Sequence, residues 1–486
     1  MSTHSAFQSG ATNAWYFYGT DGNLYTNIAR FYSYASRLLR DFCERVKERR
    51  DLPPLTIQAL YRWYYIARQG KRSSPSQAEF KIRHPEMLRE ILREVIDREY
   101  IPWPGILFIL RWPVLRECSA PVFRDRPVET MFCESIRPAV EAVMDPDSYA
   151  CRVGKGSIAA AQQLAHYWRL ESENGRYPCV WVSLDQKSFF FHLYKPLVRR
   201  IFDAIIDRYL ESGEYKDMML YLSRIITEGS PIEHAVRQCG IHEWNGLAPH
   251  KQQKNLPPDV GMSIGRLPVQ LAGALVSAMS YLAILREYGY TRFVHYTDDV
   301  KIPLREDRLQ GFLHHFMPEL RKREAMFGLE LNERKTAIQP DRHGVVAFGY
   351  FIKPVPITDA MRRRGIIQAP VLVYPTRRIV DNIERCIAYY LRRGEDRLYR
   401  LRHKEQLVAR MNSYMGILRH ANAYNLRKSY CERLMQSPWR DVLEIRGDCL
   451  YLAIRKHYTR RAYLAWKNRQ LKQLIRYEQK REDPAA

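Results

Sequence analysis

Apolar residues recur at helical spacing in several long stretches of the chain. In residues 27–49 they return every three or four positions, which predicts an amphipathic helix. Residues 127–175 and the chain from residue 376 onward are predicted to be mainly helical as well. Residues 307–328 have the pattern of a further amphipathic helix, and Gly328 is the residue that we expect to end it.

Short apolar runs between polar turns predict β-strands. In residues 101–127, prolines alternate with such runs, and residues 177–184 form a β-branched and aromatic run that ends at Asp185. Residues 292–304 are predicted to be two short strands around a polar Thr-Asp-Asp turn, and residues 328–352 continue as strand, turn and strand. The predicted fold class is therefore α+β.

One stretch is apolar enough to be tested as a membrane span. Residues 267–285 carry no charge over 19 positions, but they include Pro268, Gln270 and two serines, and no other segment resembles a span. We therefore favour a buried core helix over a transmembrane helix. The first residues lack the basic segment and apolar run of a signal peptide, so a cytoplasmic location without membrane insertion is predicted.

The composition indicates a globular protein with a polyanionic partner. Of 486 residues, 46% are apolar and 12% aromatic, which excludes a mainly disordered or fibrous chain. The net charge is +24, and residues 353–486 contain 30 Lys and Arg against 13 Asp and Glu, a local charge of +17. Nucleic acid is the first candidate partner and an anionic membrane surface the second.

Cysteines and histidines give no sign of a disulfide or zinc framework. The nine cysteines include no C-x-x-C pair, and the fourteen histidines form no metal-binding pair at helical spacing. We therefore expect reduced thiols in a cytosolic protein, and we assign the histidines no chemistry.

The most specific candidate for chemistry is Tyr296-Thr297-Asp298-Asp299, which lies between two apolar strand-like runs. Adjacent carboxylates repel, so a sheet that brings them near a third acid, Asp185, needs a cation to compensate. Two strands that end in Asp are suited to hold a pair of Mg²⁺ ions for displacement at phosphorus. A solvated turn is the simpler alternative for such a short string.

Five motifs in order give this candidate a context. Together they resemble the fingers and palm of reverse transcriptases, over roughly residues 60 to 435. The motifs are SLDQKSFF at 183–190, GMSIGRLPVQ at 261–270, YTDD at 296–299, GLELNERKTAI at 328–338 and GVVAFGYFI at 344–352.

A finer resemblance lies outside these motifs. Three segments are similar to the reverse transcriptases of diversity-generating retroelements and to bacterial defence-associated, unknown-group enzymes. The segments are RECSAPVFRDRPVETMFC at 116–133, DSYACRVGKGSIAA at 147–160 and MNSYMGILRHANAYNLRKSY at 411–430.

The resemblance implies roles for individual residues. Asp185, Asp298 and Asp299 would be catalytic and would hold two Mg²⁺ ions, or Mn²⁺ instead, with the backbone carbonyl of Gln186 as a further ligand. The nucleotide-binding candidates are Arg116, Arg126, Phe190, Gln270 and Lys335. The template- and primer-binding candidates are Arg152, Lys155, Phe348, Gly349 and Tyr350.

Two of these roles have an equally simple structural alternative. Phe190 occupies the place of a steric gate against a ribose 2′-hydroxyl, but three consecutive phenylalanines also pack well in a core. Lys335 would lie near the departing pyrophosphate, but a lysine in a turn between strands is usually just solvated.

The chain departs from the family pattern around the template and nucleotide. Val269 precedes Gln270 where the diversity-generating enzymes have Ser-Gln, and Ile264 replaces a glutamine of ordinary reverse transcriptases. Val114 and Leu115 stand where a lysine usually precedes Arg116. These changes bear on fidelity and template choice rather than on the metal ligands.

The resemblance implies a right-hand polymerase with fingers, an antiparallel-sheet palm and a helical thumb, plus helical N- and C-terminal extensions. The tail beyond residue 435 interleaves aromatic and basic residues, and would either clamp RNA or cover the thumb as a solvated helix. The expected divisions are an extension (1–55), fingers with part of the palm (56–175), palm (176–352), basic thumb (353–435) and basic C-terminal extension (436–486).

The implied activity is an RNA-directed DNA polymerase that uses dNTPs and makes DNA on an RNA template. Because the Ser-Gln pattern is broken and both ends are extended, we expect a role in anti-phage defence with a dedicated noncoding RNA. The alternatives are mutagenic cDNA synthesis in a diversity-generating retroelement, and a catalytically silent RNA-binding scaffold. An accessory protein or a second copy of the chain is a further expected partner.

Overall fold

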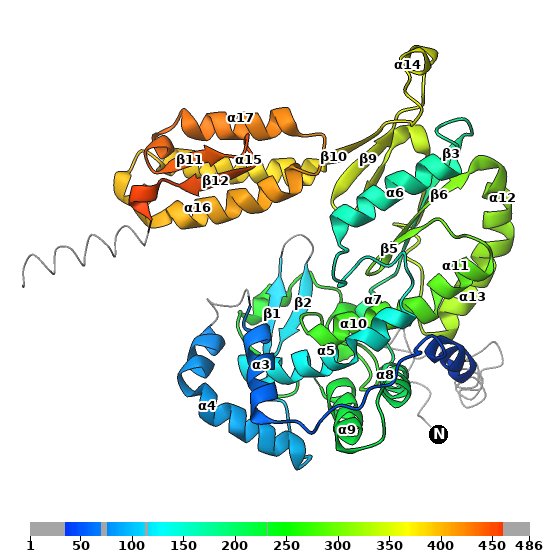
Figure 1. Cartoon of the computed structure of the whole chain (residues 1–486), viewed down its shortest axis with the longest axis vertical. Helices are drawn as coiled ribbons and strands as arrows, with labels where there is room; N and C mark the ends of the chain where they lie inside the picture. Colours follow the sequence, from blue (N-terminus) through cyan, green and yellow to red (C-terminus); the bar gives the residue numbers. More distant parts are fainter. Residues whose placement is uncertain (1–34, 70–74, 112–114, 231, 460–486) are drawn as a thin grey trace, which may run out of the picture. The chain divides into compact units, whose positions relative to one another are not determined.

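The computed structural model describes residues 35–69, 75–111, 115–230 and 232–459 (Figure 1). Contacts divide the chain into two compact units, Met1–Ala160 with Val180–Ile338, and Ala161–Cys179 with Gln339–Ala486. Helices and small sheets occur in both units, which confirms the α+β prediction. The finer division into five parts stays a prediction.

The first unit contains most of the helices that precede residue 338. Residues 35–43 are helical, as predicted for the described part of 27–49. The longer helices that follow are α3 (Ile57–Ala67), α4 (Pro75–Ile96), α5 (Arg126–Val143), α6 (Ser157–Glu171, which continues into the second unit), α8 (Lys195–Tyr209), α9 (Glu214–Glu228), α10 (Leu267–Met279) and α13 (Met317–Met326). The shorter ones are α7 (Phe189–His192), α11 (Tyr281–Glu287) and α12 (Leu309–Gly311).

Two sheets lie in this part of the chain. In the first, β1 and β2 form an antiparallel hairpin and β4 pairs with β1 in parallel. The second has the order β5-β6-β3-β7, and β5 pairs antiparallel with β6. The strands are β1 (Ile106–Leu110), β2 (Arg116–Ala120), β3 (Cys179–Asp185), β4 (Val236–Arg237), β5 (Val294–Tyr296), β6 (Asp299–Arg305) and β7 (Ala337–Pro340).

Strand alternation gives the second sheet two chemically different faces. Alternate residues of β3 and β6 join one hydrophobic core with α11 and α13; they are Val180, Val182, Leu184, Val300, Ile302 and Leu304. Because successive side chains point to opposite faces of a strand, Asp185 and Asp299 belong to the other face. The sheet thus covers a core on one side and presents carboxylates on the other.

The apolar stretch at 267–285 is a core element of the first unit. It forms α10 and α11, which meet at Ser280, whose backbone is not helical (φ −91°, ψ −100°). Among the described residues, Leu267–Glu287 is the one segment long and apolar enough to cross a membrane, and 78% of its most apolar window is buried inside the protein. This burial agrees with the predicted core helix.

The helix predicted at 307–328 is present but irregular. A π-helical turn at Phe312–Phe316 separates α12 from α13, and Gly328 follows α13 with a positive φ of 69°. Pro318 lies in the first turn of α13 and has no N–H, so it cannot make the regular bond to the carbonyl four residues earlier. The apolar period could not reveal this local change of helix type.

The second unit combines a small sheet with a helical bundle. The antiparallel sheet has the order β10-β9-β8, and α15, α16 and α17 pack around a core of their own (Figure 1). Its elements are β8 (Val345–Ala347), β9 (Tyr350–Pro354), α14 (Asp359–Arg363), β10 (Val371–Pro375), α15 (Arg377–Arg393), α16 (Arg397–Leu418), α17 (Tyr424–Met435), β11 (Leu443–Arg446) and β12 (Tyr451–Ile454).

A helical extension was predicted for residues 436–486. Its described part, residues 436–459, contains a β-hairpin and no α-helix, so there the prediction was wrong. β11 and β12 form an antiparallel hairpin that joins the core of the bundle through Leu443 and Leu452. The hairpin turn includes Gly447, Asp448 and Cys449, all with positive φ. Its two short strands alternate too briefly to stand out from the surrounding basic helices. The aromatic and basic tail from residue 460 lies outside the described residues.

Candidate functional site

Backbone pairing brings two predicted acidic positions together at one edge of the second sheet. β3 ends at Asp185, and the next residue, Gln186, donates its backbone N–H to the carbonyl of Asp298 at 3.0 Å. Asp298 lies in the turn between β5 and β6, where Tyr296 pairs with Asp299. The two segments are more than 100 residues apart in sequence, so the sheet creates this proximity.

The side chain of Asp185 has two partners from the segment after α13. Asn332 donates its side-chain amide to Oδ2 at 3.0 Å, and Lys335 Nζ lies 3.1 Å from both carboxylate oxygens. The backbone N–H of Asn332 also donates to the Asp185 carbonyl at 2.7 Å. Asn332 therefore fixes both the strand end and the orientation of its carboxylate.

Asp299 is paired with a lysine of its own strand. Lys301 lies two residues further along β6, so both side chains point to the same face, and its Nζ is 2.7 Å from Asp299 Oδ1. The side chain of Lys301 is only 9% exposed. A nearly buried ammonium group thus compensates one of the candidate metal ligands.

Ionisation of the turn carboxylates is unfavourable. Burial, with the nearby charges of Asp185 and Asp299, raises the pKa of Asp298 to about 6. Burial also raises the pKa of Asp299, although Lys301 opposes this shift. When these carboxyl groups are ionised, their negative charges lie close together in a partly dehydrated region. A divalent cation that binds there relieves their repulsion, so its binding is favourable.

The donor chemistry suits magnesium, because carboxylate oxygens and a backbone carbonyl are the ligands that Mg²⁺ prefers. Asp185, Asp298 and Asp299 would hold the ion with the carbonyl of Gln186. Among the described residues, no three His, Cys, Asp or Glu side chains are already gathered as a ligand cluster. Lys335 and Lys301 hold two of the three carboxylates, so ligation requires both lysines to give way.

A buried acid supports the candidate carbonyl ligand. The side-chain amide of Gln186 donates to Glu324 of α13, a residue that is 1% exposed. Burial raises the pKa of Glu324 to about 8. Gln186 is therefore tied to the helix behind the sheet as well as to the turn in front of it.

The predicted nucleotide-binding residues lie on separate elements. Arg116 is exposed at the start of β2, and Arg126 is half-buried at the start of α5. Phe190 is partly buried beside Phe189, and a Cβ added to Gly273 would lie 2.9 Å from its ring. Gly273 thus lets α10 approach that ring closely. These contacts are those of a packed residue, and they leave both interpretations of Phe190 in place.

Gln270, the one retained residue of the Ser-Gln position, is exposed on α10 and accepts a hydrogen bond from Cys151 Sγ at 3.3 Å.

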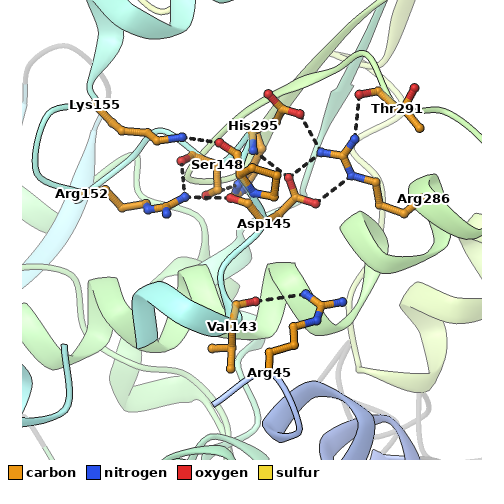
Figure 2. A network of polar contacts seen from close by, with 11 residues as sticks. Arg45, Val143, Asp145, Ser148, Arg152, Lys155, Arg286, Thr291 and His295 are labelled. Carbon is orange, nitrogen blue, oxygen red and sulfur yellow. Dashed lines mark hydrogen bonds and ion pairs between the residues drawn. The ribbon is translucent and has the colours of Figure 1, made fainter. Parts of the chain in front are cut away.

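Cys151 belongs to the loop that contains Arg152 and Lys155. Within that loop, the guanidinium group of Arg152 binds Glu141 and two backbone carbonyls. Lys155 donates to the Pro146 carbonyl (Figure 2). Both predicted template-binding cations therefore also hold their own loop together.

The predicted primer-binding residues belong to the second unit. Phe348 and Gly349, both with positive φ, form the two-residue turn between β8 and β9. Tyr350 is buried, and its hydroxyl donates to the carbonyl of Ile417 on α16 at 3.3 Å. The phenol of Tyr350 thus anchors the hairpin to the bundle.

Sequence reasoning missed several residues of this site. Lys301 had a usable signal, because a residue two positions after Asp299 in a strand must share its face. Asn332 lies inside the GLELNERKTAI motif, but only the strand pairing shows which carboxylate it contacts. Glu324 gave no signal, because burial and not residue type makes it informative, and the same holds for His295, a fully buried residue of β5 beside the Thr297-Asp298 turn.

Comparison with known proteins gives no assignment. A scan against models of protein families finds no match, and a search of curated proteins finds no significant similarity.

Proposed function

We propose that the chain is an RNA-directed DNA polymerase that transfers nucleotides at the β3 and β5–β6 site. The observation that carries this proposal is the Gln186 to Asp298 backbone bond, which joins two Asp-bearing strand ends across more than 100 residues of sequence. The ordered motifs and their resemblance to reverse transcriptases support the same reaction and the right-hand arrangement of fingers, palm and thumb.

In this proposal the protein mainly positions charge. Magnesium bound by the three carboxylates would supply activation of the primer 3′-hydroxyl and neutralisation of the triphosphate. Asn332 orients Asp185, while Lys301 and Lys335 neutralise Asp299 and Asp185 until the cation is bound. The side chain of Lys335 is 64% exposed, so it is free to turn towards a departing pyrophosphate.

The proposed biological role is anti-phage defence with a noncoding RNA that serves as template. A diversity-generating role would need a template repeat copied with errors, and a scaffold would need no DNA at all. The nucleic acid retained by the purified chain separates these roles, because defence, diversification and scaffolding predict different RNA and DNA sequences.

The decisive experiment compares the wild-type chain with Asp298→Ala/Asp299→Ala. Each protein is purified with its retained RNA and supplied with Mg²⁺ and labelled dNTPs, and both RNA and product DNA are sequenced. We expect DNA complementary to the bound RNA from the wild type, and at least a roughly 1000-fold loss in the double variant.

A matched control removes two carboxylates away from the sheet edge. Glu86→Ala/Glu90→Ala changes two exposed acids of α4 and should leave DNA synthesis unchanged. Retained RNA without DNA in the wild type, under Mg²⁺ and Mn²⁺, would contradict the polymerase proposal and favour the scaffold. Equal synthesis by wild type and double variant would place the reaction elsewhere.

A further inference from the structure

His295 is a fully buried histidine of β5, three residues before Asp298. Its backbone binds a second segment on both sides: its N–H donates to the carbonyl of Asp147, and its carbonyl accepts from Tyr149, both at 2.9 Å. Residues 147–149 therefore run parallel to β5 and form an isolated β-bridge with it at Ser148 and His295.

Both ring nitrogens of His295 are engaged. Nδ1 lies 2.8 Å from the hydroxyl of Ser148, and Nε2 lies 2.8 Å from the carbonyl of Thr297 and from the hydroxyl of Tyr281. A carbonyl can only accept, so Nε2 carries the proton and Nδ1 accepts from Ser148. Burial lowers the pKa of His295 to about 4, which keeps the ring in this neutral form.

The Thr297 carbonyl belongs to a strained residue. Thr297 has a φ of 63°, in the left-handed region that a β-branched side chain rarely adopts. Such a conformation persists only where the surroundings impose it. The hydrogen bond from His295 Nε2 is a contact that imposes it, and the next residue in the chain is Asp298.

The segment on the other side of His295 is held by several cations (Figure 2). Arg286 donates to Asp145 at 2.8 and 2.9 Å, to Asp147 at 2.6 Å and to the Thr291 carbonyl at 2.6 Å. Arg152 donates to the carbonyls of Asp145 and Ser148. Residues 145–148 are thus held by several hydrogen bonds, and Ser148 of this segment contacts the His295 ring.

We propose that His295 is a positioning residue that sets the Thr297-Asp298 turn through its Nε2–H and so places Asp298 for cation binding. The inference rests on the proposed function only in taking Asp298 as a ligand of a divalent cation. It assigns the two nitrogens separate tasks: Nε2 shapes the turn, and Nδ1 anchors the ring to Ser148.

Two amide substitutions separate these tasks. In His295→Gln, the side-chain amide nitrogen can replace Nε2 as donor to Thr297, whereas in His295→Asn the shorter amide can replace only Nδ1 as acceptor from Ser148. Ser148→Ala removes the Nδ1 partner and leaves the turn contact intact. For the full-length chain and each variant, the melting temperature is measured against Mg²⁺ concentration, and DNA synthesis is measured in parallel.

We expect His295→Asn to raise the Mg²⁺ concentration at half-maximal stabilisation by about tenfold, as for the loss of other groups that orient metal ligands. His295→Gln and Ser148→Ala should shift it less than about threefold. The melting temperature without Mg²⁺ reports any general damage to the fold.

Equal Mg²⁺ midpoints in the Asn and Gln variants would overturn the inference. So would a wild-type melting temperature that changes with neither Mg²⁺ nor Mn²⁺. Failure of the proposed function looks different. If the wild type is stabilised by Mg²⁺ but makes no DNA, the polymerase proposal is wrong. The order of the Mg²⁺ midpoints among the variants still tests the role of His295.

Discussion

The two units of the chain use charged side chains in opposite ways. In the first unit, arginines are buried against acids: Arg124 is 1% exposed and contacts Glu94, and Arg266 contacts Glu129 at 2.6 Å. In the second unit, most basic residues of the helices face solvent, with Arg400 and Arg427 as buried exceptions, and residues 353–486 carry a charge of +17. Most buried charges of the described residues therefore lie in the first unit, whereas the second unit carries most of the net positive charge.

This difference suggests a division of labour. Breaking a buried ion pair leaves an uncompensated charge, so such pairs hold backbone segments in one place. Exposed cations contribute little to stability but attract phosphates over a distance set by salt. We infer that the first unit provides a precise reaction site and the second provides affinity for a polyanion.

The largest expected effect tests how strongly the interior of the first unit resists a new charge. Because burial lowers the folded-state pKa of His295 to about 4, stability from the neutral ring is present above pH 6.5 and is lost as the pH falls towards 4. Relative to His295→Gln, which does not titrate, the wild type should lose about 3 kcal/mol of unfolding free energy between pH 7 and pH 4.

Chemical denaturation at a series of pH values measures this difference. All carboxylates are common to both proteins, so their titration cancels in the comparison. A difference that stays constant between pH 7 and pH 4 would mean that His295 is accessible to protons in the folded chain. The contrast between a dry, fixed interior and a solvated basic surface would then be lost.

A smaller effect tests the surface of the second unit. Arg377, Arg392 and Arg397 are exposed on α15 and α16, and replacing all three with Gln should weaken binding to single-stranded RNA. If each contacts one phosphate, the slope of log affinity against log salt falls by about 2. Fluorescence anisotropy with labelled RNA at several salt concentrations gives this slope.

The matched control for this change lies in the first unit. Lys81, Arg83 and Arg89 are exposed cations of α4, and their replacement with Gln removes the same net charge. The control should leave the salt slope nearly unchanged. Equal slopes for the two triple variants would show that RNA responds to net charge alone and not to the second unit.

The carboxylate pattern was predictable from sequence because it depends on strands. An apolar run that ends at Asp185 and a polar turn at Thr297 place acids at strand ends whatever the rest of the fold does. The residues that restrain those acids were not predictable. Asn332 and Glu324 contact segments distant in sequence, and the His295 ring, although it binds Thr297 two residues away, is held by the distant Ser148. No local period encodes the distant contacts.

The C-terminal hairpin was not predicted for a similar physical reason. β11 and β12 have four residues each, and their pairing with each other and packing on α16 override a basic, helix-like composition. The π-helical turn before Pro318 was missed for a related reason. Sequence periodicity reports which face is buried, but tertiary contacts decide short elements and helix irregularities.

The smallest expected effect concerns Lys301, a nearly buried lysine of the first unit. Replacing Lys301 with Met removes the ammonium 2.7 Å from Asp299 and leaves that carboxylate without its cation. Mg²⁺ then no longer competes with Lys301, so its half-saturation concentration should fall about fivefold, or roughly 1 kcal/mol. The Mg²⁺ titration is run at pH 8, because losing Lys301 raises the pKa of Asp299 further and a higher pH favours the ionised carboxylate.

Lys187→Met is the control for this last change, since Lys187 is close to the site in sequence but pairs with Glu330 at 2.9 Å. Its Mg²⁺ midpoint should change less than twofold. If Lys301→Met instead weakens Mg²⁺ binding, Lys301 helps to position the carboxylate ligands and does not merely occupy the position of the cation. The first unit would then use this nearly buried lysine for geometry, which sharpens its contrast with the exposed arginines of the second.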